Sequence, residues 1–338
     1  MIPHSDVIHS TDSWQSQLSN TVTSAERLLR MLGLSASDVG FSVQACADFP
    51  LKVPLAFVAR MQVGDPADPL LRQVLATQQE LQFTPGYQRD PVGETGESNP
   101  QRGIIHKYQG RALLIVSGNC AINCRYCFRR HFPYSDNQNS RRQWREALQY
   151  IGDDNSIQEV ILSGGDPLVV SDRQLQELVS EIAAIPHVLR LRIHSRLPIV
   201  LPDRITDKLL NVICHPDLQT VMVVHCNHGR EIDAAVVTAM AALRERDITV
   251  LNQAVLLAGI NDEAQALIEL SEQLFRAGVL PYYLHLLDRV QGAAHFDVPE
   301  DRARSLLRDI ASQLPGYLVP KLVREVAGAD AKIGLSAR

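Results

Sequence analysis

The chain has 338 residues, 45% of them hydrophobic and 21% charged, and its formal net charge at pH 7 is −5. This length can bury a substantial core, and the slightly acidic balance gives no general attraction for nucleic acid. The first residues lack the basic and apolar segments of a leader, and no apolar run approaches the ~20 residues that span a bilayer. We therefore expect a cytoplasmic protein with no nucleic-acid partner and no membrane partner.

Residues 1–88 predict an N-terminal helical region. Apolar side chains recur at helical spacing over residues 24–32, where Gly33 closes the helix, and the pattern starts again at 69–75. Residues 89–110 are predicted to be a connecting loop, because this part of the chain is rich in proline, glycine and acidic residues.

From residue 111 to residue 314, short apolar runs alternate with segments of helical length. Strand and helix repeated six times imply a parallel sheet, and right-handed crossovers curl such a sheet toward a barrel. Six units are too few for a closed eight-stranded barrel, so the α/β sheet is expected to be open. The expected strands are 112–116, 159–162, 189–193, 220–224, 249–254 and 282–286, and the expected helices are 141–151, 172–185, 233–245, 263–277 and 301–314.

Three closely spaced cysteines, Cys120, Cys124 and Cys127, follow the first of these strands. Thiolates are soft ligands that favour iron–sulfur clusters or zinc, and three ligands in place of four would leave one metal position open for a substrate or cofactor. Two alternatives remain from the cysteines alone. A disulfide would leave an odd thiol, and His131 could complete a Cys3His zinc site in a non-enzymatic interaction protein.

Polar motifs follow each of the other predicted strands. In α/β barrels, the loops at the carboxyl ends of the strands carry the chemistry, so these motifs are expected to meet at one rim. Two arginines nearby, Arg111 and Arg196, could bind a carboxylate or a phosphate, although a structural ion pair is an equal alternative. The motifs are Ser163–Asp166, His194–Arg196, His225–His228, Gln253 and Asp288.

The cysteine spacing, with Tyr126 before the last cysteine, resembles the signature of the radical S-adenosylmethionine (SAM) enzymes. The stretches Tyr126–Arg130, Ser163–Leu168 and Asn252–Leu257 further resemble the lysine 2,3-aminomutases. Within that family they resemble the branch that makes (R)-β-lysine for the modification of translation elongation factor P. The resemblance implies an open (β/α)6 partial TIM barrel over 111–314, with an N-terminal helical region and a short C-terminal cofactor-binding segment at 315–338.

The resemblance also implies cofactors for named residues. It assigns Cys120, Cys124 and Cys127 to a [4Fe–4S] cluster whose remaining iron binds SAM. Lys332 matches the catalytic lysine that the family uses to hold pyridoxal 5′-phosphate (PLP), whereas a lysine near a C-terminus is otherwise usually a solvated charge. For the glycine pair seen alone, a plain tight turn would be the better interpretation. The residues matched to SAM are Gly164, Gly165, Asp166, His225 and Gln253.

Lysine bound to PLP presents a carboxylate and a distal ammonium group, so the site needs one cation and at least one anion held apart. Arg129 matches the family residue that pairs with the carboxylate, and a guanidinium group can bind a carboxylate in a bidentate way. Asp288 and Glu325 match the two acids that hold the ammonium group, with Glu325 standing where the family has aspartate. Two acids in this place count against glutamate as the substrate.

The function implied is a radical isomerase that moves the α-amino group of L-lysine to the β-carbon. The stretch before Lys332 has fewer glycines than the matching run in the family, and the chain ends six residues after Lys332. Both features favour the elongation-factor branch. In that branch a lysyl ligase attaches the β-lysine to elongation factor P, and an electron donor reduces the cluster. Two alternatives stay open: β-lysine made for catabolism or as an osmolyte, and a lysyl group already attached to protein as the substrate.

Overall fold

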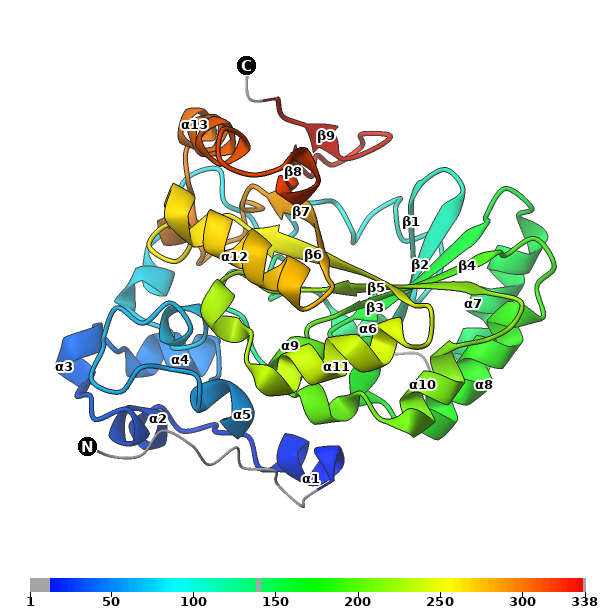
Figure 1. Cartoon of the computed structure of the whole chain (residues 1–338). Coiled ribbons are helices and arrows are strands. Elements are labelled where there is room, and N and C mark those ends of the chain that lie inside the picture. Colours follow the sequence, from blue (N-terminus) through cyan, green and yellow to red (C-terminus); the bar gives the residue numbers. More distant parts are fainter. Residues whose placement is uncertain (1–12, 138–140, 337–338) are drawn as a thin grey trace.

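Parallel strands form the centre of the protein in the computed structural model, which describes residues 13–137 and 141–336 (Figure 1). The sheet has nine strands, and their order in space follows their order in the chain, from β1 to β9. The first and last strands are antiparallel to their neighbours, and every neighbouring pair from β2 to β8 is parallel. The strands are β1 Ile104–Tyr108, β2 Arg111–Ser117, β3 Glu159–Gly164, β4 Arg190–Ser195, β5 Gln219–Val224, β6 Thr249–Val255, β7 Leu280–His285, β8 Lys321–Arg324 and β9 Ile333–Gly334.

The six predicted strands are confirmed as β2 to β7, and so is the open sheet, since β1 and β9 are its two edges. Two predictions were wrong in detail. The expected connecting loop at 89–110 contains β1, which pairs Ile104 with Leu114 and Ile105 with Leu113. The C-terminal segment adds a seventh parallel strand, β8, which is only four residues long and carries a charge at each end. Such a short, charged strand has little apolar pattern to reveal it.

Amphipathic helices cover the outside of the curved sheet (Figure 1). In α8, for example, the buried residues Leu175, Leu178, Val179 and Ile182 recur at helical spacing, and Ser171 caps the first turn. The five predicted helices are present, and α9 and α10 are additional ones between β4 and β5. The covering helices are α7 Arg141–Asp153, α8 Asp172–Ala183, α9 Leu197–Val200, α10 Asp207–Ile213, α11 Ala234–Arg244, α12 Ala264–Arg276 and α13 Glu300–Ala311, and α6 Tyr134–Asn137 lies before them in the chain.

The N-terminal helices gather beside the barrel (blue in Figure 1). The predicted helix at 24–32 is α2, which begins after its cap Ser24 and is followed by Gly33 in the left-handed region at φ 65°. The helix expected at 69–75 was wrong: only a 3-10 turn forms at Leu71–Gln73. Residues 1–12 of the predicted region lie outside the described residues. The helices here are α1 Trp14–Ser19, α2 Ala25–Met31, α3 Ala36–Val39, α4 Val43–Asp48 and α5 Leu55–Val58.

This N-terminal region supports the loop that carries the cysteines. The backbone N–H of Asn123 donates to the carbonyl of Lys52 at 2.9 Å, and that of Arg125 donates to the carbonyl of Gln73 at 3.0 Å. The Asn123 amide also donates to the carbonyl of Pro50 at 2.8 Å. Together these three bonds fix the path of the loop after β2.

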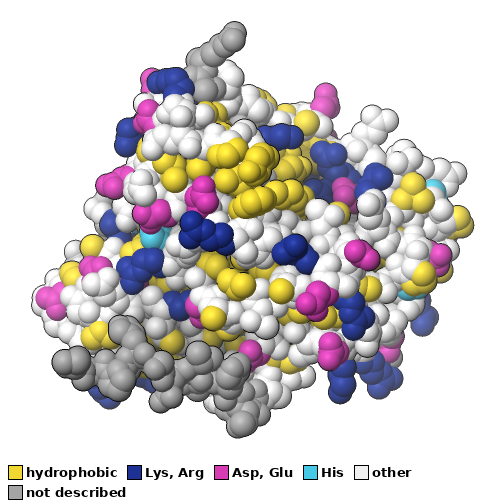
Figure 2. Space-filling view, in the orientation of Figure 1, with side chains coloured by type: hydrophobic (Ala, Val, Ile, Leu, Met, Phe, Trp, Pro, Cys, Tyr) yellow, Lys and Arg dark blue, Asp and Glu magenta, His cyan; other side chains and the backbone are white. Residues whose placement is uncertain are grey.

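The face shown in Figure 2 carries side chains of Lys and Arg interspersed with those of Asp and Glu, and hydrophobic side chains gather in one area above the centre. Charges of both signs on this face give no single-sign surface there. Of the helices in the described ranges, none is both long and apolar enough to cross a membrane.

Candidate functional site

A cavity of about 820 Å³ lies at the carboxyl ends of the parallel strands. Parallel strands bring their carboxyl ends to one rim, so motifs far apart in the sequence meet there. Every residue that the sequence predicted for the site lines this cavity. They are Cys120, Cys124, Cys127, Arg129, Gly164, Gly165, Asp166, His225, Gln253, Asp288, Glu325 and Lys332.

The three cysteines of the loop after β2 are half-buried free thiols that face the cavity. All six cysteines of the chain lie within the described residues and are free, so the disulfide alternative is not what this structure contains. His131 lines a different, smaller cavity beside Gln291, which separates it from the three thiols and tells against a Cys3His site. Burial, with Cys124 adding to it, raises the pKa of Cys127 to about 11, so a bound cation is needed to keep its thiolate.

The glycine pair after β3 lies in close backbone contact with the loop that leads to the cysteines. A side-chain carbon on Gly164, whose φ is 122°, would lie 2.4 Å from the carbonyl oxygen of Ser117, and one on Gly165 would lie 2.5 Å from that of Asn119. Both glycines are therefore required by packing of the polypeptide itself. Their contact with SAM stays a prediction.

Asp166 is buried, and its carboxylate joins the loop after β3 to the loop after β4. One oxygen accepts from the Ser195 hydroxyl at 2.7 Å and the Leu168 N–H at 3.0 Å. The other accepts from the N–H groups of Arg196 and Leu197 at 2.8 and 3.1 Å. Through these four hydrogen bonds the carboxylate holds two site loops together. The contact of Asp166 with SAM stays a prediction.

We expect Asp166→Asn to lower the free energy of unfolding by about 2–3 kcal/mol, since an amide N–H would then face backbone N–H donors in a buried place. Urea unfolding measures the effect. Asp217→Asn is the matched control, because the Asp217 side chain is 74% exposed and its replacement should cost less than about 0.5 kcal/mol. Equal stabilities of the two variants would contradict this structural role.

Three histidines, His194 on β4, His225 just after β5 and His285 on β7, face the cavity. Among the described residues, the Nε2 atom of each is buried without a hydrogen-bond partner. Burial lowers the pKa of His225 to about 4, so its ring is neutral at pH 7 and can accept or donate a hydrogen bond. Unpartnered polar atoms that face a cavity are groups a ligand can satisfy.

Arg129 lies in the loop after β2, beside the end of β3, and its guanidinium group is paired with the carboxylate of Glu94. Its Nε and Nη2 donate to the two carboxylate oxygens of Glu94 at 2.6 and 2.9 Å, and its Nη1 donates to the Ser163 hydroxyl at 3.0 Å and the Gly164 carbonyl at 3.2 Å. The pair is buried. A substrate carboxylate would therefore bond the remaining N–H of Nη2, or displace Glu94.

Glu325 follows β8 and forms an ion pair of 2.5 Å with Lys332. Tyr108 donates to Glu325, and the Lys107 ammonium lies 3.5 Å from the same carboxylate, so Glu325 bridges the two edges of the open sheet. Burial opposes its charge, but Lys332 and these donors outweigh burial and lower the pKa of Glu325 to about 2. Burial raises the pKa of Asp288 to about 7, opposed by Lys332 and supported by Glu325.

Several residues of the site were missed by the sequence analysis. Glu94, Lys107 and Tyr108 lie in the stretch 89–110 that was expected to be a plain connecting loop. The pair of isoleucines in β1 was a signal for a strand there, but nothing in the sequence pairs Glu94 with Arg129. Arg196, proposed as an anion partner, is a structural ion pair with Glu231, since its Nη2 lies 3.1 Å from that buried carboxylate.

The donor set fits the cofactors of the resemblance. Three free thiols that line one cavity are the ligand type of a cluster with an open iron position. Among the described residues of this ligand-free structure, no three His, Cys, Asp or Glu side chains are already grouped to hold a metal ion. For a phosphate-bearing aldehyde, the same cavity offers the amine of Lys332 and the cations Arg111 and Arg192, and Tyr282 and Tyr283 also line it.

The comparisons with known proteins agree with this site. The radical SAM superfamily matches residues 114–271, which run from β2 to α12 and contain the three cysteines. The chain is 49% identical to L-lysine 2,3-aminomutase of Escherichia coli strain K12, over 96% of this chain and 95% of the relative.

Further relatives carry the same name. The protein of Haemophilus influenzae strain Rd is 45% identical over 98% of both chains, and that of Methanococcus maripaludis is 34% identical over 95% of this chain and 76% of the relative. Identity of this extent covers the whole barrel. The chain is thus an isomerase of the L-lysine 2,3-aminomutase family, within the radical SAM superfamily.

Proposed function

We propose that this enzyme converts L-lysine to (R)-β-lysine in the cytoplasm, with SAM, a [4Fe–4S] cluster and PLP as cofactors. The single observation that supports lysine as the substrate is the placement of charge in the cavity. Arg129 lies beside the end of β3, whereas Asp288 and Glu325 follow β7 and β8, and Glu94 and Lys107 join Arg129 to Glu325 through a chain of ion pairs. A cavity that holds a cation at one place and two acids at another matches an amino acid with a distal ammonium group.

When bound, the cluster and SAM supply the radical and PLP carries the migrating nitrogen. The chain contributes binding and orientation. Cys120, Cys124 and Cys127 hold the iron, and Lys332 holds the aldehyde of PLP. The buried walls exclude water from the reacting centre.

Arg129 orients the substrate carboxylate, and the two acids orient the ammonium group. A Lys332 that held PLP would present no free ammonium group to Glu325, so this carboxylate would be available to an incoming substrate beside its contacts with Tyr108 and Lys107.

An anaerobic assay tests the activity. Protein reconstituted with iron and sulfide is incubated with L-lysine, PLP, SAM and dithionite, and the products are separated by chirality. We expect (R)-β-lysine. Absence of β-lysine from protein with an intact cluster and bound PLP would refute free lysine as the substrate and would direct the test to protein-attached lysyl groups.

The destination of the product is part of the proposal and rests on the motif resemblance described above. We infer that a lysyl ligase attaches the β-lysine to elongation factor P. Deletion of the gene, followed by mass spectrometry of elongation factor P, is expected to remove the β-lysyl mass, and wild-type protein should restore it where Cys124→Ala does not. An unchanged mass would favour catabolic or osmolyte β-lysine instead.

The affinity for lysine is expected to depend on pH through Asp288, whose pKa is about 7. Below pH 7 its charged fraction falls about tenfold per unit, so the KM for lysine should rise by up to about tenfold per unit as the pH is lowered, and level off above pH 7. The neighbouring Glu325, which Tyr108 and Lys107 contact in addition to Lys332, has a pKa of about 2 in the ligand-free protein.

Steady-state assays from about pH 5.5 to 8.5 measure this dependence. Asp288→Asn should raise KM and remove the pH dependence of KM. The stability of the ligand-free protein depends on pH in the opposite direction. The folded chain keeps a proton on Asp288 that the unfolded chain has released, so the stabilisation from Asp288 is lost as the pH rises from about 4 to 7. A KM that is flat through pH 7 in the wild type would contradict the assignment.

A further inference from the structure

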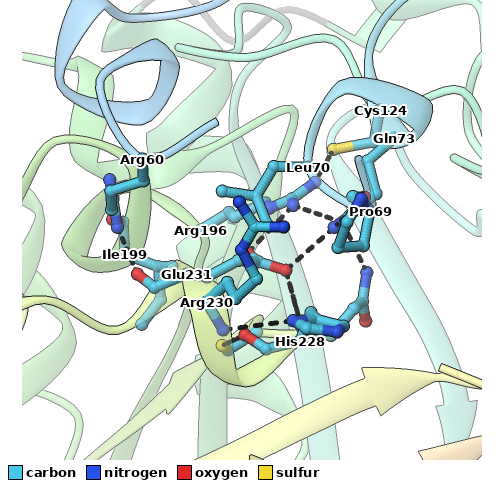
Figure 3. A network of polar contacts seen from close by, with 12 residues as sticks. Arg60, Pro69, Leu70, Gln73, Cys124, Arg196, Ile199, His228, Arg230 and Glu231 are labelled. Carbon is cyan, nitrogen blue, oxygen red and sulfur yellow. Dashed lines mark hydrogen bonds and ion pairs between the residues drawn. The ribbon is translucent and has the colours of Figure 1, made fainter. Parts of the chain in front are cut away.

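Arg196 is a buried arginine that contacts one of the cysteine sulfurs directly. It follows β4 as the N-cap of α9, and only 5% of its surface is exposed. Its Nη1 lies 2.6 Å from the Sγ of Cys124 and 2.6 Å from the hydroxyl of Tyr126, the residue directly before Cys127. In Figure 3 its guanidinium group lies between the sulfur of Cys124 and the carboxylate of Glu231.

The other edge of the guanidinium group is held by two residues distant in sequence. Nη2 donates to the side-chain oxygen of Gln73 at 2.7 Å and to the carboxylate of Glu231 at 3.1 Å. Gln73 in turn donates to Glu231 at 3.0 Å, and both side chains are completely buried. Glu231 therefore has a fixed place from which it orients Arg196.

Further contacts leave these groups little freedom to move. The other carboxylate oxygen of Glu231 accepts from the backbone N–H groups of Asn227 and His228 at 3.0 and 3.2 Å. The Asn227 amide donates to the Tyr126 hydroxyl at 2.6 Å. A side chain held at both edges by buried partners can present an N–H group to a sulfur without reorganisation.

A cationic N–H donor beside a ligating thiolate has a predictable effect. One-electron reduction adds negative charge to the cluster and its sulfurs, and a fixed positive charge with a hydrogen bond stabilises that charge. The pairing of Arg196 with Glu231 offsets part of the charge at longer range, while the N–H contact at the sulfur remains. Reduction is the step that an electron donor must accomplish before the radical can form.

We propose that Arg196 is a positioning residue for the cluster: held by Glu231 and Gln73, it fixes Cys124 and raises the reduction potential through its N–H contact with the Cys124 sulfur. The inference rests on the assignment of the three cysteines to the cluster. It concerns the ease of reduction and leaves the choice of substrate untouched.

The chain offers a matched control in Arg60. This arginine belongs to the same buried network, where it donates to the backbone carbonyls of Glu231 and, at 2.8 Å, of Ile199 (Figure 3). The guanidinium carbons of Arg60 and Arg196 lie 5.3 and 5.5 Å from the centre of the same ring, Phe57. Arg60 has no described contact with a cysteine sulfur of the loop, so Arg60→Met removes a comparable buried cation without touching the cluster.

The test is a redox titration of the anaerobically reconstituted protein, followed by the electron paramagnetic resonance of the reduced cluster. At a fixed solution potential we expect Arg196→Met to lower the ratio of reduced to oxidised cluster at least tenfold, which is about 59 mV for a one-electron couple. Arg60→Met should leave the ratio at the wild-type value. Arg196→Lys, which keeps the charge for Glu231 but loses the forked contact, should lie between the two.

Each result decides the proposal. A wild-type potential in Arg196→Met, or equal shifts in Arg196→Met and Arg60→Met, overturns it, because the effect would then be absent or merely structural. If Arg196→Met does not fold, Arg196→Lys decides alone, and a wild-type potential in that variant overturns the proposal. Wild-type protein that forms no cluster would instead refute the assignment of the cysteines, and the inference with it.

Discussion

Cys124→Ala is expected to reduce bound iron from about four atoms per chain to near background after anaerobic reconstitution, and to abolish lysine isomerisation. Cys124 is one of the three free thiols that face the cavity, and two remaining thiolates do not hold a cubic cluster stably. Iron and sulfide analysis measures the first effect, and the anaerobic assay measures the second.

The control is Cys214→Ala. Cys214 follows α10 on the outside of the barrel, where its thiol contacts the carbonyl of Arg246, and it does not line the cavity. We expect wild-type iron content in this variant. Retention of a full cluster by Cys124→Ala would remove the basis of the site.

Lys332→Arg is expected to abolish the covalent attachment of PLP and to lower the turnover rate by at least about 10²-fold, because the aldehyde loses the amine that positions it. Arginine keeps the positive charge beside Glu325, so the ion pair across the cavity is largely preserved. Borohydride trapping of PLP on the protein, followed by peptide mass spectrometry, measures the attachment.

Lys208→Arg is the control, since Lys208 is exposed on α10. Iron content should be the same in both variants and in the wild type, which separates loss of PLP from loss of the cluster. PLP found on a peptide without residue 332 would contradict the assignment of Lys332.

The polar network around Arg196 also explains why an N-terminal helical region accompanies the barrel. Gln73 belongs to that region, and it contacts Arg196 and Glu231 while its carbonyl accepts from the loop residue Arg125. The N-terminal region therefore contributes to the order of the cysteine loop, in addition to covering the barrel.

The sequence by itself determined the architecture of the barrel, and it predicted twelve site residues that the structure brings to one cavity. Alternating apolar runs fix strands and helices locally, and parallel pairing then brings all carboxyl ends to one rim. The cluster loop and the cofactor lysine, Lys332, could be predicted because such features are recognised by residue type and local spacing, and their roles stay predictions. The short strand β8 and the edge strand β1 could not be predicted, since their patterns of apolar residues are weak.

Only the tertiary structure decided the partners of the charged residues. The pairs of Arg129 with Glu94 and of Arg196 with Glu231 join residues separated by 35 positions, and the bond of Arg196 to Gln73 joins residues separated by 123. No local pattern encodes such pairs, because an ionic contact depends on which loops meet at the rim and how deeply they are buried. The pKa of Asp288 is about 7 for the same reason, since burial in the assembled cavity sets it.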